Sequence, residues 1–189
     1  MKGFPILAAL AALLLLPAVA QAQAPDTAAI AAQQAAMGRL SAMRGTWRGT
    51  AVTQIQGKEE RVTHTERVGT FLDGTVTLVE GKAYADDGSV PFHAFAVISY
   101  DAATRTYWMT SHAQGRTGRF ELKLSDTGYV WEIPAGPATI RYTATLSGKS
   151  WVEVGDYIAP GQPPRRFFTM ELTRLGDTSW PEAGGVAPR

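Results

Sequence analysis

The chain has 189 residues, 45% of them hydrophobic and 19% charged, which is enough apolar material for one globular domain with a sizeable core. Lys and Arg number 18 against 17 Asp and Glu, so the chain lacks the basic excess of a nucleic-acid-binding protein. It has no cysteine, which excludes disulfides, iron–sulfur clusters, thiolate zinc sites and cysteine nucleophiles.

The first 22 residues have the pattern of a secretory signal peptide. Lys2 is followed by an Ala- and Leu-rich segment, residues 4–20, and then by Ala20-Gln21-Ala22 and Ala22-Gln23-Ala24, which both fit a small-x-small cleavage site. The apolar core, residues 6–16, is shorter than the roughly 20 residues of a membrane-spanning helix, and no cysteine follows it for lipid attachment. The sequence predicts a periplasmic or secreted bacterial protein, with no stable membrane anchor after Sec-type export and cleavage.

Residues 23–44 are predicted to form one N-terminal helix. Asp26 can cap its first turn, and Gly45 can end it. Met37, Leu40 and Met43 follow one another at spacings of three and lie near one stripe. We expect this stripe to pack against one mouth of the following domain.

From Trp47 onward the sequence changes to a period of two, with segments rich in Thr, Val, Tyr, Phe and Trp between short turn signals. Connectors such as Gln56-Gly57 and Asp73-Gly74 supply residues that tolerate a positive φ, and such short links join only antiparallel neighbours. About ten segments are predicted as strands: 47–55, 61–71, 75–84, 92–100, 106–111, 116–124, 129–133, 139–146, 151–158 and 165–173.

Ten meandering strands in one sheet twist until the sheet edges meet. The predicted fold class is therefore all-β: a single up-and-down antiparallel β-barrel over residues 45–175. A two-sheet sandwich is the alternative that the same pattern permits. Residues 176–189 are rich in Gly, Pro and Ala, show no period and are predicted to be a flexible C-terminal tail.

Several short motifs of this chain occur in a recognisable order. They are Met43-Arg44-Gly45-Thr46-Trp47, the Phe71-Leu72-Asp73-Gly74 hairpin, Ser99-Tyr100-Asp101 followed by Tyr107-Trp108, and the terminal segment 169–174. Together, over residues 40–175, they resemble a bacterial family of secreted lipocalin-like (calycin-type) barrels of unknown function. The resemblance implies a barrel whose interior holds a small, mostly apolar molecule. Other barrels of the superfamily bind fatty acids, retinoids or haem.

The resemblance also implies a structural role for Trp47 and Arg174. The indole is expected to lie across the closed barrel end, with the Arg174 guanidinium packed over it. Such a pair combines a cation–π contact with donors for the carbonyl groups at the strand ends.

The sequence has three histidines, which titrate near neutral pH. The connector 102–105 has the form of a type I turn closed by one left-handed residue, Arg105, and would pair Asp101 with Thr106. The same register sets Phe95 opposite His112 and places His93 diagonal to His112 on one face. A slip of one residue would separate the two histidines onto opposite faces.

The face with the histidines mixes large apolar groups with a few polar ones, as ligand cavities do. The rival face, which carries Ala96, Ile98, Tyr100 and Met109, is about as apolar, and periodicity does not decide between them. Because a barrel interior tolerates polar groups through enclosed water, we assign the histidine face to the lumen. The candidate ligand-binding residues are His93, Phe95, Val97, Ser99, Trp108, Thr110 and His112.

No metal site and no catalytic residue are predicted. His64, His93 and His112 come from separate strands without the spacing of zinc ligands. Haem ligation by His93 or His112 remains a minor alternative, because one axial imidazole suffices. Glu153 and Asp156 lie on opposite faces of one strand and do not converge. No Gly-x-Ser-x-Gly elbow, phosphate loop or dinucleotide fingerprint occurs, so the sequence does not favour an enzyme.

The sequence favours an exported carrier or sensor that binds a small apolar or aromatic molecule in its lumen. The alternative is a structural or interaction module whose barrel is filled by its own side chains. A small-molecule isomerase or hydrolase that uses a lumen histidine as a base is a weaker alternative.

Overall fold

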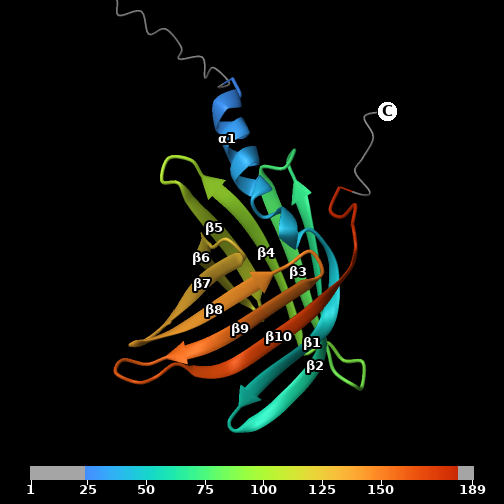
Figure 1. Ribbon diagram of the computed structural model, residues 1–189, viewed down its shortest axis with the longest axis vertical. Helices are drawn as coiled ribbons and strands as arrows, with labels where there is room; N and C mark the ends of the chain where they lie inside the picture. The colour runs from blue at the N-terminus through green and yellow to red at the C-terminus, as the bar shows by residue number, and fades with distance from the viewer. Residues whose placement is uncertain (1–23, 183–189) are drawn as a thin grey trace, which may run out of the picture.

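The structure is a computed structural model that describes residues 24–182, and it shows a closed antiparallel barrel of ten strands with one α-helix at one end (Figure 1). Consecutive strands pair in chain order, and β1 pairs with both β2 and β10, which closes the ring. The predicted up-and-down barrel is confirmed, and the two-sheet alternative is not adopted. The predicted signal peptide, residues 1–22, lies outside the described residues.

The ten strands agree closely with the predicted segments, and most are longer by one to three residues. Their bounds are β1 Gly45–Ile55, β2 Lys58–Phe71, β3 Val76–Tyr84, β4 Phe92–Asp101, β5 Thr106–Ala113, β6 Arg116–Leu124, β7 Gly128–Ala135, β8 Ala138–Leu146, β9 Ser150–Ile158 and β10 Arg165–Gly176.

The turns have the backbone angles that their residues favour. In the β1–β2 turn, Gln56 and Gly57 have φ values of 50° and 79°, as a two-residue hairpin loop requires. In the β4–β5 turn, Arg105 has a φ of 56°, and the Asp101 carboxylate accepts a hydrogen bond of 2.9 Å from the amide of Ala103. The β4–β5 turn therefore sets the predicted register, with Asp101 opposite Thr106.

The helix α1 (Thr27–Gly38) stands at one end of the barrel, and its last turn leads into the mouth (Figure 1). The Asp26 side chain accepts a hydrogen bond from the amide of Ala29, as predicted for the cap. The helix ends earlier than predicted, at Gly38, and a 3-10 turn (Ser41–Met43) follows. The packing prediction is confirmed, since Met37, Leu40 and Met43 are 0%, 3% and 2% exposed.

Hydrogen bonds tie the helix to the strand ends around it. The Tyr107 hydroxyl donates to the carbonyl oxygen of Ala36 at 2.9 Å, and the Gln33 side chain donates to the carbonyl oxygen of Tyr100. The Gln34 side chain donates to the carbonyl oxygen of Asp73 in the β2–β3 turn. We call this end of the barrel the helix end and the opposite end the far end.

The indole of Trp47 lies inside the helix end and is 1% exposed, as predicted. Its Nε1 donates to the carbonyl oxygen of Met43 at 2.8 Å, and its ring meets that of Trp151 edge-on at 5.8 Å. Arg174 pairs with Trp47 in the register of β1 and β10 and donates to the carbonyl oxygen of Arg44. The expected carbonyl contact is therefore present.

The expected stacking of Arg174 on the indole needs a correction. The arginines that stack on aromatic rings in the described part of the chain are Arg67, Arg119 and Arg165. The guanidinium of Arg174 instead bridges the Arg44 carbonyl and the Asp177 carboxylate. An arginine gains more from charge-assisted hydrogen bonds than from an exposed ring face.

The segment after β10 packs against the outside of the barrel wall. Trp180 lies under the guanidinium of Arg67, 4.4 Å from the ring centroid, and meets Phe95 edge-on at 6.5 Å. Gly69 allows this approach, because a Cβ there would lie 1.9 Å from the carbonyl oxygen of Trp180. The predicted flexible tail, residues 176–189, thus begins with a strand end and a packed tryptophan, and residues 183–189 lie outside the described part.

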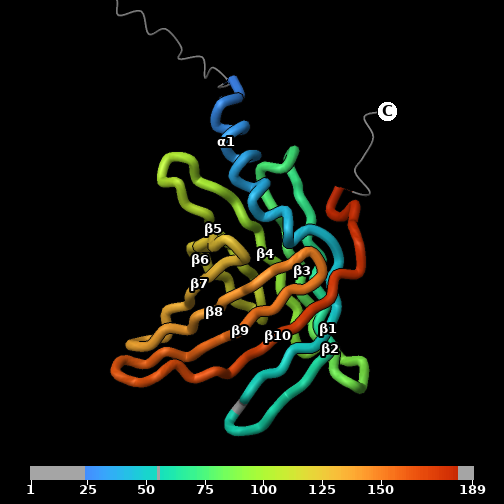
Figure 2. The backbone as a smooth tube through the Cα atoms, in the orientation of Figure 1, coloured from blue at the N-terminus to red at the C-terminus, as the bar shows by residue number. Residues whose placement is uncertain are grey.

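The barrel wall is weakest between β6 and β7. Seven residues of β6 pair with β5, but only Leu122, Lys123 and Leu124 pair with β7, at the helix end. On the opposite side of the barrel, by contrast, β1 lies beside both β2 and β10 along its length (Figure 2). Toward the far end, β6 and β7 are no longer paired.

Candidate functional site

Trp47 shows which face of each strand points into the barrel. Side chains alternate along a strand, and partners in an antiparallel register share a face. The paired positions Trp47, Glu66, Gly81 and Ala94 therefore share the inner face from β1 to β4. The hydrophobic core confirms this assignment, since Trp47, Val68, Ile98, Tyr107 and others on this face are buried together.

The predicted register of β4 and β5 is confirmed, but the predicted orientation of this hairpin is wrong. Ser99 lies opposite Trp108, and Phe95 lies opposite His112. The inner face carries Ile98 and Met109, which belong to or pack against the core. The seven residues proposed to line the lumen lie together on the outer face: His93, Phe95, Val97, Ser99, Trp108, Thr110 and His112.

The contacts of these seven residues are those of an outer surface. The His93 side chain is 52% exposed and lies 3.2 Å from the Glu80 carboxylate. The His112 ring is exposed and pairs with the hydroxyl of Thr117 at 3.0 Å. The Trp108 ring is covered by Arg119 at 4.0 Å, and Phe95 by Trp180.

Both faces of the hairpin are apolar because both are covered. The helix end covers the inner face, through the contacts of α1 with Tyr100 and Tyr107. The segment after β10 covers part of the outer face through Trp180. Haem ligation inside the barrel by His93 or His112, and a catalytic role for either as a lumen base, are therefore not supported.

The half of the interior nearest the helix is filled by side chains. Trp47 and Trp151 cross this half, and Tyr129 meets Trp151 edge-on at 6.3 Å. Leu122, Met170 and Leu172 complete the packing and are each 2% exposed. For this half of the barrel, the structure agrees with the side-chain-filled alternative.

The far half of the interior holds a row of partly exposed aromatic rings. Phe120 and Trp131 lie 5.2 Å apart, and Trp131 stacks on Tyr142 at 4.5 Å with an interplanar angle of 11°. Tyr142 then meets Phe167 and Phe168 edge-on. All five rings have intermediate exposure although they lie on or beside the inner face. We call these five residues the aromatic row.

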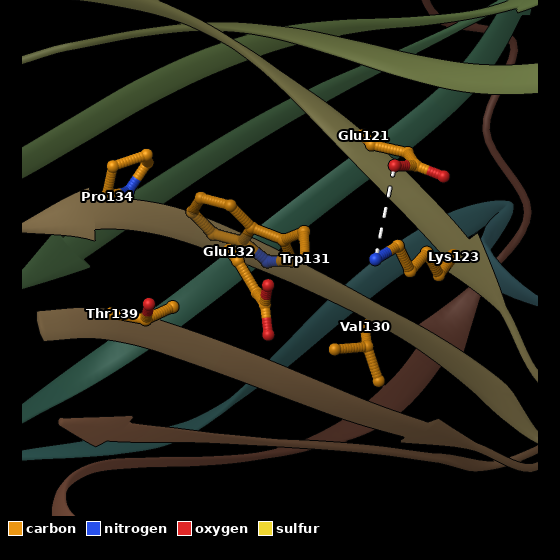
Figure 3. Close-up of a pocket in the computed structure, with 7 residues that line it drawn as sticks. All are labelled: Glu121, Lys123, Val130, Trp131, Glu132, Pro134 and Thr139. Atoms are coloured by element: carbon orange, nitrogen blue, oxygen red, sulfur yellow. Dashed lines mark ion pairs between the residues drawn. The ribbon is translucent and has the colours of Figure 1, made fainter. Parts of the chain in front are cut away.

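A cavity of about 230 Å³ lies at the separation of β6 and β7, beside the aromatic row (Figure 3). Most of its lining side chains belong to the outer face, among them Glu121 and Lys123 on β6 and Glu132 on β7. Trp131, by contrast, belongs to the inner face and also lines the cavity. The cavity therefore lies on the outer side of the wall and touches one residue of the aromatic row, Trp131.

Four polar side chains lie on the inner face between the filled half and the aromatic row. The Tyr129 hydroxyl donates to the Glu153 carboxylate at 2.9 Å. The Nε2 atom of His64 lies 2.9 Å from the carboxylate of Glu66, and both of these side chains are largely buried. We call Glu66, Glu153, His64 and Tyr129 the polar group.

The environment changes the acidity of this group strongly. Burial raises the pKa of Glu153 from 4.5 to about 7; the hydrogen bond from Tyr129 lowers it, and the negative charge of Glu66 raises it further. Burial and the charge of Glu153 also raise the pKa of Tyr129 well above its usual value, and that of Tyr142 to about 12. One carboxyl in the interior is therefore half protonated at neutral pH.

Sequence reasoning missed the polar group because it did not place these strands relative to Trp47. The sequence shows only that Glu153 and Asp156 lie on opposite faces of one strand, and Glu66 belongs to no recognised motif. The signal that could have found Glu66 is the two-residue Gln56-Gly57 turn, which pairs Trp47 with Glu66 and so puts that acid on the inner face.

In residues 24–182, no three His, Asp or Glu side chains are placed to hold a metal ion. Over the same residues, no helix has the length and apolar character to cross a membrane.

The protein therefore belongs to the class of closed antiparallel β-barrels, with ten strands and a helix packed against one end. No protein-family model and no curated protein match the chain. Among solved structures, the chain is similar to the crystal structure of Rv2717c from M. tuberculosis, with a TM-score of 0.55 and 12% sequence identity. The match covers 74% of this chain and 96% of that chain, and it supports the barrel fold.

Proposed function

We propose that the protein is an exported, lipocalin-like carrier or sensor that binds a small apolar or aromatic molecule in the far half of its barrel. The observation that carries this proposal is the aromatic row, whose five rings lie on or beside the inner face and yet remain partly exposed. Exposed aromatic surface inside a barrel is unfavourable in water, and a bound apolar ligand would remove it from water.

The adjoining cavity supports the same site. A cavity of about 230 Å³ accommodates a small ring system or a short alkyl chain, and it reaches Trp131 at the centre of the aromatic row. The filled half of the barrel limits the ligand to the far half. The expected ligand is therefore smaller than those that fill a whole lipocalin lumen.

Tryptophan emission tests the proposal directly. Saturation with a small aromatic alcohol, 1-naphthylmethanol, or with a medium-chain fatty acid should change the emission of Trp131, because the ligand replaces water at its ring. Isothermal titration supplies the affinity, and native mass spectrometry of protein from its own compartment looks for a co-purified small molecule. Haem is included in the panel as a further probe.

A pair of matched variants locates the response. Trp108→Phe removes a tryptophan from the outer face and should retain the emission change, whereas Trp131→Phe should lose most of it. If no member of the panel binds, or if Trp131→Phe responds as the parent does, the site in the far half is refuted. The filled-barrel interaction module would then be the better interpretation.

A further inference from the structure

The polar group lies in a part of the interior that carries two acids and little to balance them. Glu66 and Glu153 are close enough for the charge of Glu66 to raise the pKa of Glu153. Their hydrogen-bonding partners among the described residues are His64 and Tyr129. Among the described residues, the arginines that share the inner face by register lie at its two ends, Arg174 at the helix end and Arg116 and Arg165 at the far end, and none lies level with the two acids.

The polar group is also incomplete in its hydrogen bonding. The Oε2 atom of Glu66 is buried and accepts no hydrogen bond from the described residues. Buried polar atoms are nearly always paired in folded proteins, so this free carboxylate oxygen indicates a hydrogen-bond donor from outside the described chain.

A glycine opposite Glu66 leaves room for the Glu66 side chain inside the barrel. Gly81 lies opposite Glu66 in the register of β2 and β3, and a Cβ at this position would lie 2.7 Å from the Glu66 carboxylate. Any larger residue at position 81 would displace the acid.

We infer that the far half of the barrel binds a small molecule with an aromatic or apolar body and a protonated amine, the body against the aromatic row and the amine at Glu66 and Glu153. The inference rests on the function proposed above and names the chemistry of its ligand. An ammonium group would supply an N–H donor for the unpaired Oε2 atom of Glu66 and a positive charge beside both carboxylates. The rings of Trp131 and Tyr142 next to the polar group would add cation–π attraction.

Three probes with the same ring and different charge test the inference: 1-naphthylmethylamine, 1-naphthylmethanol and 1-naphthoate. Isothermal titration at pH 7.5 should give the order amine, alcohol, carboxylate, with the amine at least about tenfold tighter than the alcohol, as a charge-assisted hydrogen bond contributes. Amine affinity should also rise from pH 6 to pH 8, because Glu153 ionises over this range while the amine stays protonated.

Two variants and a control connect the preference to the polar group. Glu153→Gln and Glu66→Gln should each reduce the preference for the amine to about threefold or less while leaving alcohol affinity within about twofold, which also shows that each variant is folded. Glu171→Gln, on the outer face of β10, should retain the full preference. Each of the two interior variants tests the inference independently if the other does not fold.

The outcomes separate the two proposals. If the alcohol binds but the amine binds no more tightly, or if both interior variants keep the amine preference, the cationic ligand is refuted and the apolar site stands. If none of the three probes binds at millimolar concentration, the proposed function and this inference are both refuted.

Discussion

Trp47 is the motif residue of the first strand and, with Trp151, one of the two largest fully buried side chains of the core. Its indole N–H is paired with the carbonyl oxygen of Met43, and its ring is packed against Trp151. Trp47→Ala would leave a large cavity under the helix. We expect it to lower the free energy of unfolding by about 3–5 kcal/mol, as truncation of core aromatic residues does.

Urea unfolding monitored by circular dichroism measures this loss, and Trp108→Ala is the matched control. Trp108 lies on the outer face against Arg119, so its removal should cost only about 1 kcal/mol. A loss below about 1 kcal/mol for Trp47→Ala would contradict its place at the centre of the core.

Glu153 makes the stability of the empty barrel depend on pH in an unusual direction. Its pKa is raised by burial from 4.5 to about 7 in the folded state. The folded protein therefore binds more protons than the unfolded chain between these values, and the free energy of unfolding falls as pH rises through this window. The shift corresponds to about 2–3 kcal/mol between pH 4.5 and pH 8.

The difference between the parent and Glu153→Gln isolates this contribution from those of other groups. Glu80, for example, has its pKa lowered: burial raises it, but hydrogen bonds from His93, Arg67 and Lys82 and the charge of Arg67 lower it by more. That carboxyl contributes equally to both proteins. Stability curves that stay parallel from pH 5 to pH 8 would show that Glu153 titrates normally.

At the scale of the elements, turns with defined chemistry made the strands and their registers predictable. The 102–105 loop gave the correct pairing of β4 with β5, because Arg105 adopts a positive φ and Asp101 holds the turn amides. The direction of the hairpin was not predictable. Residues 85–91 between β3 and β4 form an irregular seven-residue connection, which interrupts the phase that the Gln56-Gly57 and Leu72–Gly74 turns carry from Trp47.

The segment after β10 was not predictable for a different reason. Its Gly and Pro content is that of a loose end, and its packing depends on a distant residue without a side chain. Gly69 lets the Trp180 backbone touch β2, and the Trp180 ring fills the space between Arg67 and Phe95. Composition alone does not report such a contact, because Trp180 is 85 positions from Phe95 and more than a hundred from Arg67 and Gly69.

Gly69→Ala should release this segment without unfolding the barrel. The new Cβ would lie 1.9 Å from the Trp180 carbonyl oxygen, so the segment has to move away. We expect limited proteolysis within residues 177–182 to become about tenfold faster, with a loss of about 1 kcal/mol in stability from the lost cation–π and ring contacts. Gly38→Ala, where a Cβ meets nothing within 4 Å, serves as control and should leave proteolysis unchanged.

At the scale of the whole molecule, the barrel has two unequal halves. The helix and the large side chains near it fill one end and supply most of the buried apolar surface. The far half keeps its aromatic row partly exposed, and next to it one oxygen of the buried Glu66 carboxylate has no partner among the described residues. Groups that are poorly satisfied persist in a stable fold where function requires them, and here the filled half provides the stability that the far half lacks.

The seam between β6 and β7 should be the place where the barrel opens. Only three residues of β6 pair with β7, so the amides of residues 116–121 that point across the seam have no strand partner there, while alternate amides still pair with β5. Hydrogen exchange resolved by residue should show fast exchange at every second amide of this part of β6 and slow exchange at the others; β7 offers few probes, since Pro134 has no amide hydrogen. A ligand against Trp131 should slow the exposed set, because it holds the two strands together. Uniform protection along β6 and β7 in the empty protein would show that the wall is closed in solution, and the ligand would then have to enter through the far end.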